Sequence, residues 1–100
     1  MTTYYATFLR PGTGWDPDKP VREQPYWDDH ARLMDSLFES GVIILAGPFA
    51  DKTGSMVIVA ADNPNRVREM FRADPWTKHD VLVVFDVKEW TIFLDAREGQ

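Results

Sequence analysis

Four segments of the chain are rich in β-forming and apolar residues, and turn-forming residues bound each of them. Short runs of this kind are typical of β-strands. They predict strands at residues 3–9, 42–49, 55–61 and about 80–87. A further apolar piece at 90–94 either extends the last strand or forms a short fifth one.

Two segments between these strands carry helical signals. The first helix begins near Pro25 and closes at Gly41, and its apolar residues recur every three or four positions at Trp27, Ala31, Met34, Leu37 and Phe38. The second begins with Asn63 as the N-cap and Pro64 as the first helical residue. It ends near Ala73, because the next residue precedes a proline and disfavours the α conformation.

The resulting order, β-α-β-β-α-β, predicts one domain over residues 1–100 with a ferredoxin-like α+β fold. Right-handed crossovers place both helices on one face of a four-stranded antiparallel sheet. However, residues 42–45, 56–59 and 81–84 are apolar at successive positions, so these strands are apolar on both faces. We therefore expect a second, identical chain to cover the open sheet face and form a homodimer.

A long segment without regular structure, residues 10–24, separates the first strand from the first helix. Its prolines and glycines punctuate a loop. Loops of this length are often lids or binding loops, and Trp15 supplies an apolar anchor. The alternative is a mobile surface loop.

The composition narrows the classes of function. With 44% hydrophobic residues, the 100-residue chain has the composition of a packed globular domain. Its net charge of −5 and the absence of a basic stripe argue against nucleic-acid binding. The chain has no cysteine, and its apolar runs, such as residues 42–46, are too short for a membrane helix. No signal peptide is visible, so we expect a cytoplasmic protein without a membrane partner.

Only two histidines are present, and His30 is the better candidate for chemistry. It shares the apolar face of the first helix, where an imidazole near a carboxylate acts as a general acid or base. Asp74 and Asp51 are the candidate carboxylates, and the residues alone do not choose between them. The simpler interpretation of His30 is a satisfied histidine at the margin of the core. His79, in the loop before the last strand, has no expected role.

Other chemistry is disfavoured. Asp28, Asp29 and His30 are consecutive on a helix and point in different directions, so we expect no metal site there. Gly12 and Gly14 lack the third glycine and the strand–helix context of a dinucleotide loop, so no dinucleotide cofactor is expected. Aromatic residues flank the candidate site and suit an apolar pocket for a small molecule: Trp15, Tyr26, Trp27, Phe49 and Trp76.

Several short motifs occur together in a specific order. They are Trp27-Asp28-Asp29-His30-Ala31, Ala46-Gly47-Pro48, Thr53-Gly54-Ser55, Asp74-Pro75-Trp76 and Val87-Lys88-Glu89-Trp90. This set resembles the YciI-like (YCII-related domain) family over about residues 26–94. The segment 10–24 is longer than the corresponding part of that family, which affects substrate size and access to the pocket.

The resemblance implies a dimeric α+β barrel and a site in which a histidine of the first helix pairs with an aspartate, beside the Ala-Gly-Pro segment. His30 matches the histidine, and we assign the aspartate to Asp74. The activity it implies is elimination or isomerisation on hydroxylated or chlorinated aromatic rings without a cofactor. The fold also resembles that of muconolactone isomerases and cofactor-free monooxygenases, which is an analogy of fold alone.

The leading hypothesis is a small cofactor-independent lyase or isomerase with His30 as the general base and Asp74 as its orienting partner. Its substrate pocket is expected to be lined by Trp27, Gly47, Pro48, Ser55 and Trp76. The main alternative is a non-catalytic module that binds a small ligand or assists a partner enzyme. A third interpretation is a purely structural dimer.

Overall fold

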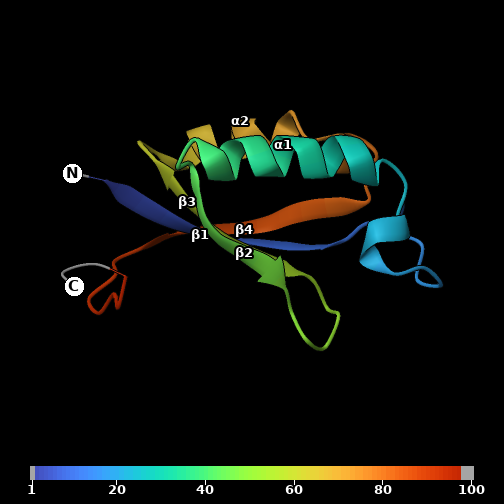
Figure 1. The fold of residues 1–100 in the computed structure, drawn as a ribbon, viewed down its shortest axis with the longest axis horizontal. Coiled ribbons are helices and arrows are strands. Elements are labelled where there is room, and N and C mark those ends of the chain that lie inside the picture. Colours follow the sequence, from blue (N-terminus) through green and yellow to red (C-terminus); the bar gives the residue numbers. More distant parts are fainter. Residues whose placement is uncertain (1, 98–100) are drawn as a thin grey trace.

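A four-stranded antiparallel sheet forms one layer of the protein (Figure 1). The computed structural model describes residues 2–97. The strands lie in the order β2-β3-β1-β4. They span Thr3–Pro11 (β1), Ile43–Pro48 (β2), Ser55–Ala61 (β3) and Leu82–Trp90 (β4). The predicted α+β class and four-stranded antiparallel sheet are confirmed.

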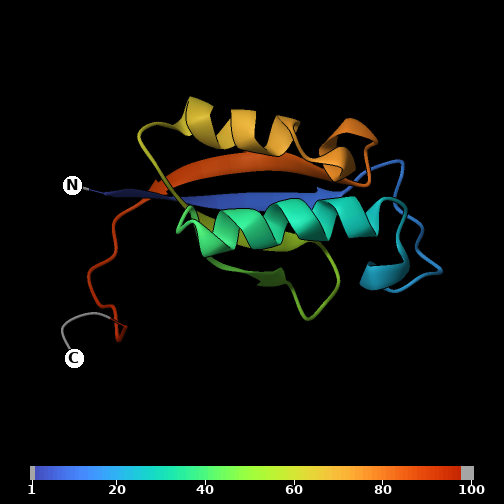
Figure 2. The same cartoon turned by 45° about the horizontal axis from the view of Figure 1, so that its top comes forward.

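The helices cover a single face of this sheet (Figures 1 and 2). The two longer ones are α1, Trp27–Glu39, and α2, Pro64–Arg72. Between α2 and β4 lies a four-residue helix, α3, Pro75–Lys78, and a 3₁₀ turn, η1, Val21–Glu23, precedes α1. No helix of residues 2–97 has the length and apolarity needed to cross a lipid bilayer.

Most element boundaries agree with the sequence-based prediction, and the differences have local causes. The first helix begins at Trp27 rather than near Pro25, because Tyr26 takes a left-handed conformation with φ of 63°. Asn63 caps α2 as expected, by accepting a hydrogen bond from the backbone N–H of Arg66. Strand β4 extends through Trp90, whereas residues 91–94 form no strand.

The short helix α3 was not predicted. The Asp74-Pro75 pair indicated only the end of α2, and the residues after it were interpreted as a loop. In the structure the same pair begins a helix, with Asp74 as the N-cap and Pro75 in the first turn. The side chain of Asp74 accepts a hydrogen bond from the backbone N–H of Trp76. This extra turn holds Asp74 and Trp76 against the core.

The hydrophobic core lies between the sheet and the helices, and the helices contribute unequally to it. Its buried members are Tyr5, Leu9, Ile43, Val57, Val59, Val67, Phe71, Trp76, Val81 and Leu82. Helices α2 and α3 contribute fully buried side chains, whereas α1 contributes none. Helix α1 therefore packs less tightly on the sheet than its neighbours, which leaves space beside it.

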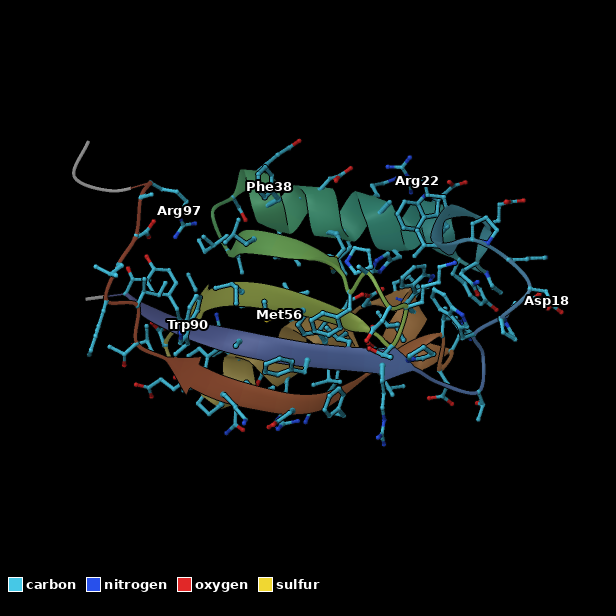
Figure 3. All side chains as sticks on the ribbon, turned by 90° about the horizontal axis from the view of Figure 1, so that it is seen from below. Asp18, Arg22, Phe38, Met56, Trp90 and Arg97 are labelled. Carbon is cyan, nitrogen blue, oxygen red and sulfur yellow. The ribbon has the colours of Figure 1, made fainter. Side chains whose placement is uncertain are left out.

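The opposite face of the sheet carries exposed large apolar side chains. Because side chains alternate along a strand, Phe8 and its ring neighbour Phe85 lie on the face away from the core. Trp90, labelled on this face in Figure 3, and Leu45 are also on it. Leu45, Phe85 and Trp90 are 53%, 51% and 44% exposed. The sheet thus has a second apolar surface, and the homodimer remains a prediction.

Two glycines of the 10–24 segment let the backbone approach the connection between α3 and β4. The N–H of Gly14 donates to the carbonyl of Asp80 at 2.8 Å, and the N–H of Gly12 donates to that of Val81 at 3.1 Å. A Cβ at Gly14 would lie 2.2 Å from the carbonyl oxygen of His79. These glycines therefore serve a close backbone contact.

We expect Gly14→Ala to reduce the free energy of unfolding by about 2 kcal/mol, because the added methyl overlaps a backbone oxygen that cannot rotate away. Urea denaturation followed by tryptophan fluorescence measures this change. Gly47→Ala is the control, since a Cβ there meets no atom within 4 Å. It should change the stability by less than about 0.5 kcal/mol. Equal effects of the two substitutions would contradict the role given to Gly14.

Candidate active site

A histidine of α1 contacts the aspartate that caps α3, although the two are 44 residues apart in sequence. The Nδ1 atom of His30 lies 2.8 Å from Oδ2 and 3.0 Å from Oδ1 of Asp74. An ionised carboxylate can only accept, so the contact assigns the ring proton to Nδ1. The other nitrogen, Nε2, has no hydrogen-bond partner among residues 2–97. It is the atom that a bound molecule can reach.

The position of Asp74 at the start of α3 explains how its carboxylate is tolerated in the interior. The residue is only 1% exposed. Its Oδ1 accepts a hydrogen bond of 3.0 Å from the N–H of Trp76, in addition to the contact with His30. Helix capping and imidazole binding thus use the same carboxylate, and both satisfy a charge that would otherwise be costly to bury.

Trp76 fixes the plane of the imidazole ring. The two rings are stacked, with their centroids 3.7 Å apart and their planes at 8°. The indole Nε1 donates to the carbonyl oxygen of Pro25 at 2.7 Å, so Trp76 is itself held from the segment before α1. Trp27 packs against both rings, at 5.7 Å from His30 and 5.6 Å from Trp76. The imidazole therefore has little freedom to rotate.

The 10–24 segment closes around this cluster. The Trp15 ring meets the Trp76 ring edge-on, with centroids 6.0 Å apart. The side chain of Gln24, which is 3% exposed, accepts from the N–H of Asp16 and donates to the carbonyls of Asp16 and Lys19. Trp15 is the apolar anchor that the sequence indicated, and the buried Gln24 was not foreseen.

A groove of about 730 Å³ opens beside His30, between α1, η1 and the ends of β2 and β3. Among the residues that line this groove are the five candidate substrate contacts: Trp27, Gly47, Pro48, Ser55 and Trp76. Its floor is formed by core side chains such as Leu9 and Phe71. Asp74 does not line the groove and acts from behind the imidazole.

Sequence reasoning missed part of this lining. Val21, Arg22 and Glu23 of η1 form one end of the groove, and Met34 and Phe38 continue its α1 wall. The helical spacing of Met34 and Phe38 was visible in sequence, but it was attributed to the core. No local signal indicated that η1 would reach the groove.

The structure places Asp51, the other candidate partner, away from His30. It lies exposed in the β2–β3 hairpin, where its carboxylate accepts hydrogen bonds from the hydroxyl and N–H of Thr53 at 2.6 Å and 3.1 Å. These hydrogen bonds lower the pKa of Asp51. His79 is exposed and stacks on the Tyr26 ring at 4.0 Å. No group of three imidazole or carboxylate side chains within residues 2–97 is arranged to hold a metal ion.

The comparisons with known proteins give a family and a fold. A family model described as YCII-related domain matches residues 15–91. Among solved structures, a similar one is 5-chloro-2-hydroxyhydroquinone dehydrochlorinase (TftG) from Burkholderia phenoliruptrix AC1100, in complex with 2,5-dihydroxybenzoquinone. Its TM-score is 0.59 at 22% identity, over 88% of this chain and 93% of that one. No curated protein is significantly similar to this chain in sequence.

We expect Asp74→Ala to lower the free energy of unfolding by about 3 kcal/mol, because it removes a helix cap and leaves a partly buried imidazole without its partner. Asp74→Asn keeps an oxygen acceptor and should cost less. Urea denaturation at neutral pH measures both changes. The control is Asp51→Ala in the exposed hairpin, expected to change stability by less than about 1 kcal/mol. An equal loss in the two alanine variants would show that Asp74 has no special structural role.

Proposed function

The chain belongs to the YCII-related domain family, and on that premise we propose that it is a cofactor-independent enzyme of the lyase or isomerase type. His30 acts as the general base and then as the general acid, and Asp74 orients it. The observation that carries this proposal is the paired imidazole at the wall of a groove, with Nδ1 held by a buried carboxylate and Nε2 without a partner in the described part of the chain. This arrangement suits proton transfer to and from a bound molecule.

The chemistry needs only a proton shuttle. His30 Nε2 accepts a proton from a hydroxyl or an activated carbon of the substrate, and Asp74 stabilises the imidazolium that forms. In an elimination, the electron pair of the broken C–H bond forms a C=C bond while the leaving group departs with its own bonding pair. In an isomerisation, the imidazolium returns the proton to another carbon.

Two features support a small hydroxylated ring as the substrate. The groove has mainly apolar and aromatic walls, and Ser55 adds a hydroxyl from the β3 side. The structurally similar dehydrochlorinase was solved with a dihydroxybenzoquinone, which is such a ring. Trp27 and Trp76 supply the aromatic wall beside His30, and residues Gly47 and Pro48 form the wall opposite α1.

We expect His30→Ala to reduce kcat at least a hundredfold on 5-chloro-2-hydroxyhydroquinone, because general acid–base catalysis contributes about 10²–10⁴. Chloride release and the absorbance of the quinone product measure turnover. The matched control is His79→Ala, which removes an exposed histidine that lies outside the groove. It should retain full activity.

Two results would contradict the enzymatic proposal. If the unaltered protein binds chlorinated and unchlorinated hydroquinones without converting any, it is a binding module. If His30→Ala retains its activity, then another group carries the chemistry.

We also propose that two chains pack through their outer sheet faces as a homodimer. Each chain exposes Leu45, Phe85 and Trp90 on that face, and Phe93 and Leu94, which follow β4 in the sequence, are 90% and 95% exposed. These side chains offer apolar surface to an interface, for which the standard size is ~800 Å² per partner.

Multi-angle light scattering should give the mass of a dimer at micromolar concentration. Phe85→Lys should shift it toward the monomer, because a charge on the apolar face must be desolvated on association. Phe38→Lys is the control, since Phe38 is similarly exposed but lies on α1, on the other side of the sheet. A monomeric unaltered protein would refute the proposal.

A further inference from the structure

One face of α1 forms a continuous wall of the groove. Trp27, His30, Met34 and Phe38 follow one another at intervals of three and four residues, and all four line it. At a rise of 1.5 Å per residue, Phe38 lies roughly 12 Å along the helix from His30. Figure 3 shows Phe38 and Arg22 at opposite ends of α1. The groove therefore continues well beyond the imidazole.

The space is larger than one small ring requires. A volume of about 730 Å³ lies in the upper part of the range for sites that bind drug-sized ligands. The cause is visible in the packing, because α1 has no fully buried residue and its apolar face is left partly uncovered. Phe38 is 61% exposed, although it lies on the apolar face of the helix.

Polar and apolar groups are distributed unequally along the groove. Arg22 and Glu23 belong to η1, which precedes α1 in the sequence and contacts it. Toward the end of α1 the lining side chains are Met34 and Phe38, with Ile43 on the floor, and only the exposed Asp35 adds a charge at the rim. One end thus suits a polar, reacting group and the other suits hydrocarbon.

We propose that the substrate is a hydroxylated ring that carries an apolar substituent, an alkyl chain or a second ring, which lies along α1 toward Phe38. This inference rests on the proposed function, because it takes the ring to be the part that reacts at His30. The substituent covers the apolar face of α1, so it adds binding energy in proportion to the hydrocarbon removed from water.

The test compares two probes that differ only in the substituent: 2,5-dihydroxybenzoquinone and its 3-hexyl derivative. Isothermal titration calorimetry on the full chain should give a Kd at least tenfold lower for the hexyl compound. In Phe38→Ala this advantage should fall to less than threefold, while the affinity for the unsubstituted ring stays unchanged. Glu39→Ala, at the same end of α1 but outside the groove, should behave like the unaltered protein.

Four results would overturn the inference. They are equal affinity for the two probes, no binding of either probe, a hexyl advantage that survives in Phe38→Ala, and conversion of a dimer into a monomer by Phe38→Ala. The last result would make Phe38 a contact between subunits.

Failure of the proposed function is a separate outcome. The calorimetry is repeated with His30→Ala, and turnover is measured in both the unaltered protein and this variant. A hexyl advantage that depends on Phe38, in a protein without turnover, supports the ligand class and refutes the enzyme. Turnover that is lost in His30→Ala, in a protein that shows no hexyl advantage, supports the enzyme and refutes the ligand class.

Discussion

The buried carboxylate of Asp74 is the group on which the arrangement of the site depends. It accepts from the N–H of Trp76 and from Nδ1 of His30, so one side chain begins α3 and also ties that helix to α1. A buried charge is tolerated only when its hydrogen bonds are satisfied, and here each partner comes from a different element. Loss of either hydrogen bond would leave the buried carboxylate only partly satisfied. The helix cap and the geometry of the imidazole therefore depend on each other.

The uneven packing of the helices explains why the groove lies where it does. Helices α2 and α3 bury side chains in the core, whereas α1 stays partly uncovered and is held at its start by the stacked His30 and Trp76 rings. The 10–24 segment closes the same end through Trp15. Side chains are therefore tightly packed next to the imidazole, whereas the groove stays open along the rest of α1. A site of this shape can hold a reacting group in one orientation at the packed end and accept substituents of different size at the open end.

The strands, the two longer helices and their order could be predicted because their signals are local. Apolar spacing fixes which face of a helix is buried, and Asn63-Pro64 begins α2 as its residue types require. The errors occur where one signal has two structural solutions. Asp74-Pro75 can end one helix or begin another, and only the docking of Trp76 against the core selects the second. The left-handed Tyr26, which delays the start of α1, has no clear local signal either.

By itself, the sequence determined the α+β class, the antiparallel sheet with its two apolar faces, and the residues with suitable chemistry. The five residues that it indicated for a pocket lie on the groove, but it did not indicate Arg22 or Phe38 there. The tertiary structure showed that Asp74, the partner indicated by the family resemblance, meets His30 rather than Asp51. It alone decided that Trp76 stacks on the imidazole and that η1 and Phe38 extend the groove. The physical reason is distance along the chain: contacts between residues 44 positions apart are set by how the helices dock on the sheet, which no local pattern encodes.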